Sequence, residues 1–176
     1  AEKIPIGESG IIAVDWFNGR RTPFANQELR GAILGLNLGS DAPRVFRALV
    51  EATAFGSKKI INQFIEDGVK ITEVIAIGGV AKKSPFVMQT IADVFNMKIK
   101  VAKSEQTVAL GAAMFAAVVG GVFKTLEEAQ AAMGSGFETV YEPIADNVKK
   151  YQVLFEQYEK IGTFIEEELT PGSAHE

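Results

Sequence analysis

Short apolar runs and longer helical periodicities alternate along the chain. The apolar run that begins at Gly10 and the β-branched run at 71–77 predict strands. Between them, apolar positions recur at helical spacing up to Asp67-Gly68, which predicts a long amphipathic helix. Ser40-Asp41 provides its N-cap and Pro43 lies in its first turn. The apolar face of this helix comprises Val45, Leu49, Ala52, Phe55, Ile60 and Phe64.

Glycine turns follow the predicted strands. Asn18-Gly19 is the pair most typical of a tight hairpin, because both central residues need positive φ. We therefore expect the first strand to turn there and return as far as Thr22-Pro23. A second strand region is expected within 29–38. The strand at 71–77 ends in a continuous apolar run, which predicts burial on both faces, and it stops at Gly78-Gly79.

The second half of the chain continues the alternation. Ser84-Pro85 combines a serine N-cap with a proline at the first helical position, so a helix is expected to run to about Phe95. A short strand is expected at 98–101. Thr107 is then expected to cap a helix that ends at Gly120-Gly121.

Two more helices are predicted near the C-terminus. Thr125 and Glu128 form a capping box at the start of a short helix that ends near Met133. A longer helix is expected from about 144 to 168. Its apolar face comprises Val148, Tyr151, Leu154, Phe155, Tyr158, Ile161 and Ile165.

This order of elements predicts an α/β fold with a largely parallel central sheet and right-handed crossovers. The length suits one domain, residues 1–176. We expect a core at about 10–122, a helical extension at about 123–168 and a polar tail at 169–176.

Composition excludes several classes of function. With 47% hydrophobic and 23% charged residues, no long apolar stretch and no leader-like start, the chain is expected to be cytoplasmic and to bind no membrane. It has no cysteine, and its only histidine, His175, lies in the polar tail, so thiolate chemistry and a core histidine site are excluded. A net charge of −4 without a basic stripe argues against a nucleic-acid partner.

The Gly78-Gly79 turn is the main candidate for a binding site. In open α/β sheets, ligands lie beyond the carboxyl ends of the strands, and a glycine pair lets a flat ligand approach the backbone. Ser84 and the first amides of its helix could meet a polar or anionic group. A tight connection with an ordinary cap explains the same residues equally well, because both GxGxxG and GxxxxGK[ST] are absent. Lys82-Lys83 is a solvated turn unless an anion lies nearby.

Other candidates are weaker. Asp15 follows an apolar strand, where catalytic carboxylates often lie, but it is equally suited to fixing the turn or pairing with Arg20 or Arg21, and we assign it no catalytic role. The run from Glu166 to Glu168 is expected to be a solvated helix end. The small residues of the helix at 108–119 are expected to allow close packing on the sheet or on another helix; they are Gly111, Ala112, Ala113, Ala116 and Ala117.

Four segments in order carry a more specific signal: DWFNGRRTP at 15–23, LRGAILGLNL at 29–38, GGVAKKSPFVMQTIADVF at 78–95 and QTVALGAAMFAAVVGG at 106–121. Together they resemble the C-terminal part of the FGGY family of carbohydrate kinases, and within it the members that act on L-ribulose. The similarity extends from about residue 10 to about residue 165. It implies the ribonuclease-H-like fold of the actin, Hsp70 and sugar-kinase superfamily, lacking its first strands and carrying extra C-terminal helices.

The resemblance also implies a function. The parent protein would use ATP and Mg²⁺ to phosphorylate the pentulose L-ribulose at O5 in arabinose catabolism. Gly78 and Gly79 would lie against the nucleotide, and a nearby polar contact would fall to Lys83 or Ser84. Xylulose, glycerol or a related polyol is the alternative substrate. A non-enzymatic actin-like ATPase module and a purely structural domain are the alternatives from other classes.

Family members carry the catalytic base, the first phosphate loop and most sugar contacts in an N-terminal domain. The resemblance therefore implies no catalytic residue and no metal ligand in these 176 residues. We expect the chain to be a C-terminal fragment that phosphorylates no pentulose by itself. An unpaired sheet edge would allow it to form homo-oligomers.

Overall fold

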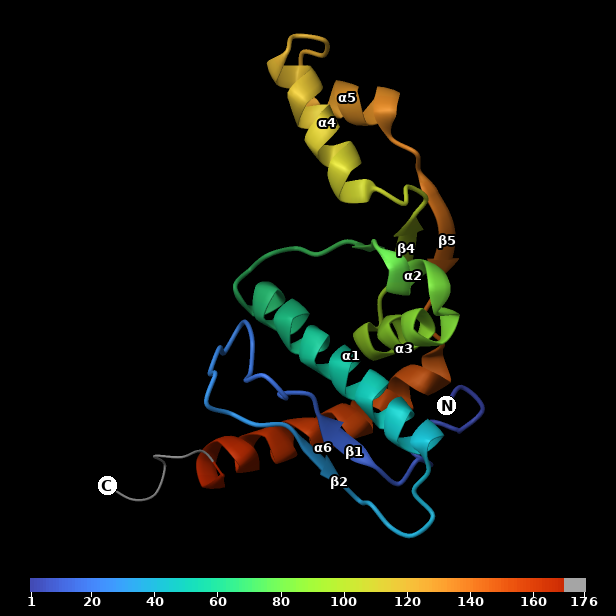
Figure 1. Cartoon of the computed structure of the whole chain (residues 1–176), viewed down its shortest axis with the longest axis vertical. Coiled ribbons are helices and arrows are strands. Elements are labelled where there is room, and N and C mark those ends of the chain that lie inside the picture. Colours follow the sequence, from blue (N-terminus) through green and yellow to red (C-terminus); the bar gives the residue numbers. More distant parts are fainter. Residues whose placement is uncertain (170–176) are drawn as a thin grey trace, which may run out of the picture.

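The structure is a computed structural model that describes residues 1–169. One end of the molecule is built from β1 (Ile12–Val14), β2 (Ala32–Leu34), α1 (Ala42–Glu66) and α6 (Ala145–Glu168). The two long helices cross each other beside the short β1–β2 ribbon (Figure 1). Segments from opposite ends of the sequence therefore form one body.

A second sheet lies beyond this body. It contains β3 (Val74–Ala76), β4 (Ile99–Ala102) and β5 (Phe137–Tyr141), in the order β3-β4-β5. β3 pairs parallel with β4, whereas β5 pairs antiparallel with β4 and has a bulge at Val101/Ala102. Since β1 and β2 are also antiparallel, the expectation of a largely parallel sheet is wrong. Strand β5 was not predicted.

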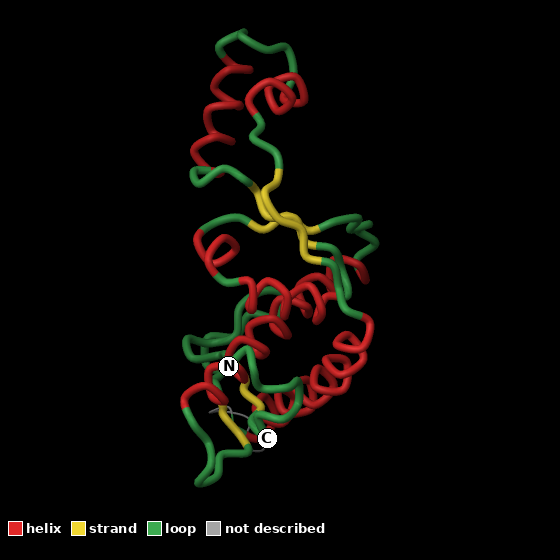
Figure 2. The backbone as a smooth tube through the Cα atoms, turned by 90° about the vertical axis from the view of Figure 1, so that its right-hand side faces the viewer, coloured by secondary structure: helices red, strands yellow, loops and turns green. Residues whose placement is uncertain are grey.

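Four further helices complete the fold. α2 (Gly79–Lys83) and α3 (Pro85–Phe95) connect β3 to β4, and α3 packs between the three-stranded sheet and α1. α4 (Thr107–Val119) and α5 (Leu126–Met133) form a helical hairpin at the far end of the molecule (Figures 1 and 2). The chain returns from that hairpin through β5 into α6.

The N-terminal strand does not turn back at Asn18-Gly19. Gly19 has the positive φ that the prediction required, 76°, but Asn18 does not. The chain instead closes a loop through two backbone hydrogen bonds between Arg20 and Asn26, and β1 pairs with β2, with Ile12 opposite Leu34. A distant segment thus replaces the predicted local return strand.

Helix α1 begins as predicted. Asp41 is its N-cap and accepts a hydrogen bond from the backbone N–H of Arg44 at 3.0 Å. Ala52 and Phe55 on its predicted apolar face are buried, but Phe64 near its C-terminal end is half exposed. The first half of α1 therefore supplies the core.

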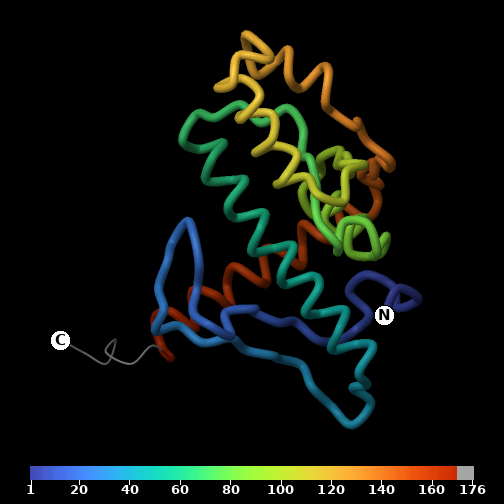
Figure 3. Tube along the Cα trace, turned by 45° about the horizontal axis from the view of Figure 1, so that its top comes forward, coloured from blue at the N-terminus to red at the C-terminus, as the bar shows by residue number. Residues whose placement is uncertain are grey.

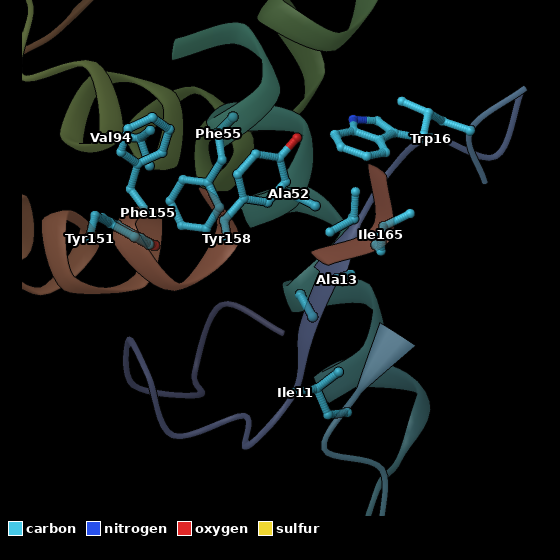
Figure 4. Packing of buried hydrophobic residues seen from close by; sticks show 14 residues of the cluster. Ile11, Ala13, Trp16, Ala52, Phe55, Val94, Tyr151, Phe155, Tyr158 and Ile165 are labelled. Atoms are coloured by element: carbon cyan, nitrogen blue, oxygen red, sulfur yellow. The ribbon is translucent and has the colours of Figure 1, made fainter. Parts of the chain in front are cut away.

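The main core lies where α1, α6 and β1 meet. Phe55 is almost fully buried, and its ring centroid lies 5.5 Å from that of Tyr158 and 5.8 Å from that of Phe155 (Figure 4). Val14 and Trp16 of the first strand region close the other side. Four of the five buried α6 residues belong to its predicted apolar face, so that prediction is confirmed; they are Tyr151, Phe155, Tyr158 and Ile165, and the fifth is Gly162.

An ion pair lies inside this body. The Nε of Arg47 donates to the Oε1 of Glu51 at 2.8 Å, and both side chains are about 95% buried, with relative exposures of 4% and 5%. Arg47 Nη2 also donates to the Tyr151 hydroxyl at 3.1 Å. Burial, together with the nearby Glu51 carboxylate, raises the pKa of Tyr151 to about 12, so this hydroxyl stays protonated.

A second buried carboxylate joins α3 to the start of α6. Asp93 Oδ1 accepts the backbone N–H of Ile144 at 2.8 Å and Gln89 Nε2 at 2.9 Å, while Oδ2 accepts Asn147 Nδ2 at 2.8 Å. Ile144 is the N-cap residue of α6 and has no side-chain cap of its own. Asp93 therefore provides the missing cap from another helix.

The other helix starts follow the predictions with two local differences. Ser84 caps α3, and Thr125 caps α5 by accepting the N–H of Glu128. Glu128 reaches back to the N–H of Lys124 rather than to that of Thr125. Thr107 is the first residue of α4 and not its cap, because its hydroxyl donates to the carbonyl of Ser104.

Two surfaces are more exposed than the pattern predicted. β3 pairs only with β4 among the described residues, and Ile75 and Ile77 are each about half exposed, so burial on both faces is wrong. The small-residue face of α4 packs neither on the sheet nor into a core, and Met114 is its only buried residue within the described chain. Only α5 lies closely against α4 (Figures 1 and 3).

Within residues 1–169, no helix is long and apolar enough to cross a membrane. His175 and nearly all of the predicted polar tail lie outside the described residues.

Candidate functional site

The predicted binding turn lies at the carboxyl end of β3. Gly78 has φ 86° and ψ −179°, a conformation essentially restricted to glycine, and it is the N-cap of α2. A Cβ built on Gly78 or Gly79 would meet no heavy atom within 4 Å. The backbone conformation therefore requires glycine at 78, but neither conformation nor packing requires it at 79. The pair leaves a bare stretch of main chain open to an approaching molecule.

Lys82 fixes this turn to the neighbouring strand. Its Nζ donates to the carbonyl of Lys103 at 2.6 Å and lies 3.4 Å from Glu138 Oε2. Lys103 directly follows β4, so the ends of both parallel strands are tied together at the same edge of the sheet. Lys82 is therefore not simply solvated, because the Glu138 carboxylate is a nearby anion of the kind that the prediction allowed for.

Lys83 and Ser84 offer different side-chain groups to a ligand. Lys83 is exposed, and no bond or ion pair of its side chain is recorded among the described residues. The Ser84 Oγ accepts the N–H of Val87 at 3.4 Å, which confirms it as a cap and leaves its own O–H able to donate. Together with the glycine pair, these residues offer bare main chain, one cation and one hydroxyl.

This arrangement can bind but lacks reactive groups. Within residues 1–169, no group of three acidic or histidine side chains could hold a metal ion. Gly78, Gly79 and Val80 are all exposed, so the turn lies on an open surface. Such a surface suits one wall of a site that another protein segment completes.

A separate pocket of about 370 Å³ lies at the other end of the molecule. The loop from Asp15 to Phe24 forms one wall, α1 forms another around Gly56, and Tyr158 of α6 lies at its base. The pocket was not predicted from the sequence, because its walls come from three distant segments. The DWFNGRRTP motif was the available signal, because it supplies most of the first wall.

One alternative predicted that Asp15 pairs with Arg20, but the two side chains do not pair. The Arg20 guanidinium makes two hydrogen bonds to Glu166, with Nη1 and Nη2 lying 2.7 and 2.6 Å from its carboxylate oxygens. Hydrogen bonding to Arg20 lowers the pKa of Glu166, so the view of this residue as only a solvated helix end is also wrong. Asp15 lies instead beside the Tyr158 hydroxyl, and burial raises the pKa of the Asp15 carboxyl.

The fold, the glycine turn at the sheet edge and the four ordered motifs define the C-terminal domain of a sugar kinase. The chain belongs to the FGGY family of carbohydrate kinases, and residues 5–120 match the C-terminal domain of that family. The predicted resemblance and the predicted α/β sugar-kinase fold are therefore confirmed.

Curated relatives of the chain include ribulokinases from several bacteria. The one from Vibrio parahaemolyticus is 49% identical over 171 residues, which covers 93% of this chain and 30% of the relative. The one from Bacillus licheniformis is 43% identical over 169 residues, covering 94% of this chain and 31% of the relative. This chain thus spans about 30% of the length of the curated relatives it matches.

Solved structures of sugar kinases share the fold. The xylulose kinase from Lactobacillus acidophilus, solved with a bound ligand, aligns with a TM-score of 0.82 at 28% identity, covering 93% of this chain and 33% of that one. Plasmodium falciparum glycerol kinase with ADP aligns with a TM-score of 0.71 at 25% identity, covering 87% and 31%. The chain shares its fold with kinases for xylulose and glycerol. Its sequence identity to those kinases is lower than its identity to the ribulokinases.

Proposed function

We propose that this chain is the nucleotide-binding C-terminal part of a cytoplasmic, ATP-dependent ribulokinase that converts L-ribulose to L-ribulose 5-phosphate in arabinose catabolism. The 49% identity to a ribulokinase over nearly the whole chain is the observation that carries the proposal. The lower identity to xylulose and glycerol kinases, 28% and 25%, makes those substrates the weaker alternatives. No feature of the chain favours a non-enzymatic actin-like module.

In this proposal the nucleotide binds at the turn after β3. Gly78 and Gly79 form a bare surface for the adenosine, and Lys83 or Ser84 makes a polar contact with it. The open space at both glycines supports this assignment, as does the exposed Lys83 ammonium, which has no ion pair within residues 1–169. Mg²⁺ would arrive with the phosphates, because the described residues contain no cluster of three carboxylate or histidine side chains that could hold it alone.

The catalytic base and most of the sugar contacts would lie in a part of the longer protein outside this chain. Phosphoryl transfer depends on positioning and on charge stabilisation around the phosphates, and an open surface provides neither. We therefore propose that the chain alone phosphorylates no pentulose. We also propose that the chain forms one domain; α6 lies within the expected extension at 123–168, but it packs on β1 and α1 and contributes to the main core with residues of the expected core at 10–122.

A chimera tests the nucleotide site. This chain would replace the matching segment of the V. parahaemolyticus ribulokinase, and we expect the chimera to phosphorylate L-ribulose. Gly79→Leu should raise its KM for ATP by about tenfold or more, because the new side chain occupies the surface that the adenosine would cover. The KM for L-ribulose should change by less than about twofold. A coupled kinase assay measures both constants.

Gly111→Leu is the matched control, since Gly111 also lies on a helix with open space at its Cβ position. It should leave the KM for ATP unchanged. If Gly79→Leu also leaves that constant unchanged in a folded, active chimera, the glycine turn is only a connection between β3 and α3.

We also propose that the isolated chain associates with itself through the open edge of β3. Ile75, Ile77 and Val80 are each half exposed or more around this edge, and unpaired edges favour strand addition. Light scattering after size-exclusion chromatography should show a mass that increases with concentration. Ile75→Lys should reduce this increase, whereas Thr72→Lys, just before the strand, should not. A monomer at every concentration would contradict the proposal.

A further inference from the structure

The glycine turn and helix α2 bury little surface of their own. α2 spans the described residues 79–83, and within them Ala81 is the only buried one. The residues before it are exposed, namely Gly78, Gly79 and Val80. A segment with so few buried contacts moves easily unless polar bonds hold it. The position of the turn therefore depends on the bonds that the side chains of α2 make with the rest of the fold.

Lys82 makes two such bonds. Its Nζ donates to the Lys103 carbonyl at 2.6 Å and lies 3.4 Å from Glu138 Oε2. The side chains of Lys82 and Glu138 are 18% and 34% exposed, so solvent screens this ion pair only in part. Hydrogen bonds from a charged donor are also stronger than those between neutral groups. The ammonium thus joins three segments, which are α2, the end of β4 and β5.

A bulge in β5 places the Glu138 carboxylate beside α2. Val101 lies opposite Thr139 and Ala102 lies opposite Phe137, which leaves Glu138 as the extra residue of β5. A bulge changes the direction of a side chain, and bulges are frequent beside functional sites. The irregular register of β5 therefore gives the ammonium its second oxygen partner.

The bond to Lys103 extends to the loop that leads into α4. The Lys103 N–H donates to the Gly136 carbonyl at 3.0 Å, so both backbone groups of Lys103 are bonded. Further on, the Gln106 N–H donates to Ser104 Oγ at 3.2 Å, and Thr107 Oγ1 donates to the Ser104 carbonyl at 3.0 Å. These bonds connect the loop to the start of α4. The ammonium therefore couples the loops that follow the two parallel strands, β3 and β4.

We propose that Lys82 and Glu138 are positioning residues for ATP, because they set the distance between the glycine turn and the loop after β4. Ligands of open α/β sheets bind at this edge, where such loops lie side by side. The inference rests on the nucleotide site of the proposed function and adds two residues that do not touch the nucleotide. The ammonium already has two oxygen partners, so it acts through the turn and not as a free charge.

Amide hydrogen exchange, followed by NMR, tests the effect on the turn in the 176-residue chain without nucleotide. Two amides report on it: the Ser84 N–H, which donates to the Val80 carbonyl at 3.1 Å, and the Lys103 N–H. In Lys82→Met both should exchange about fivefold faster or more, because α2 and the loop after β4 lose their shared bond. Unchanged exchange at either position overturns the proposal.

Kinetics of the ribulokinase chimera test the effect on ATP. Lys82→Met should raise the KM for ATP by about fivefold, whereas kcat and the KM for L-ribulose should change by less than about twofold, because only the nucleotide surface is displaced. An equal rise in the KM for L-ribulose would indicate a general loss of structure and overturns the proposal.

Glu138→Ala separates positioning from a direct bond between Lys82 and the phosphates. If the two residues position the turn, this variant should raise the KM for ATP by about threefold, in the same direction as Lys82→Met. If Lys82 binds the phosphates directly, removing the carboxylate frees the ammonium for ATP and lowers that KM. A lower or unchanged KM for ATP in Glu138→Ala therefore overturns the proposal.

Lys98→Met is the matched control, since Lys98 Nζ lies 2.7 Å from Glu142 Oε1 at the opposite end of the β4–β5 pair. It should change neither the KM for ATP nor the exchange of the two reporter amides. If Lys82→Met leaves the KM for ATP unchanged while Gly79→Leu raises it, the positioning role is wrong and the nucleotide site stands. If neither variant changes this KM, the nucleotide site and the positioning role are both wrong.

Discussion

Glu51→Ala is expected to lower the free energy of unfolding by about 3–5 kcal/mol, because it leaves the Arg47 guanidinium charged and without its carboxylate in the core. Arg47 is 3% exposed, and its remaining polar contacts are the Tyr151 hydroxyl and a longer bond to the carbonyl of Ala1. Such a loss is a large fraction of the stability of a typical domain. Urea unfolding followed by circular dichroism measures it.

The double variant Arg47→Met with Glu51→Leu is the informative control. Removing both side chains leaves no unpaired charge in the core, so this variant should recover most of the stability that Glu51→Ala loses. Lys149→Ala removes one member of the exposed pair with Asp146 and should change stability by no more than about 0.5 kcal/mol. If Glu51→Ala proves as mild as Lys149→Ala, the buried pair does not stabilise the fold.

Asp93→Asn should destabilise the chain by about 2–4 kcal/mol although it preserves the size of the side chain. Both carboxylate oxygens accept hydrogen bonds, from the N–H of Ile144 and from Asn147 Nδ2 among others. An amide has one oxygen, so its NH₂ group must face one of these donors. The N-terminal end of α6 would lose its cap, and thermal unfolding should shift to a lower temperature.

Asp146→Asn makes the same change in the first turn of α6, where the side chain is 86% exposed. It should shift the melting temperature very little. Equal shifts for the two variants would show that loss of negative charge near the helix start, and not loss of the three hydrogen bonds, explains the effect of Asp93→Asn.

The helices could be predicted because their signals are local. Asp41, Ser84 and Thr125 each cap a helix within a few residues of their own position, and the apolar face of α6 repeats at helical spacing. Strand β5 gave no comparable signal. Four of its five residues are exposed, and it exists because β4 offers an edge to pair with, which depends on tertiary structure.

The same distinction applies to the two sites. The turn at Gly78 was predictable because a strand, a glycine pair and a helix cap follow one another in the sequence. The pocket at Tyr158 was not, because Asp15, Gly56 and Tyr158 come together only when β1, α1 and α6 pack. The pairing of Arg20 with Glu166 was missed for the same reason, since 146 positions separate the two residues.

The packing of α6 against β1 has a consequence for synthesis of the chain. Val14 leaves the ribosome well before Tyr158 and Ile165, which help to bury it. At ordinary translation rates this interval is on the order of ten seconds. Val14 must remain uncovered for that time, so this core cannot form until α6 has been synthesised.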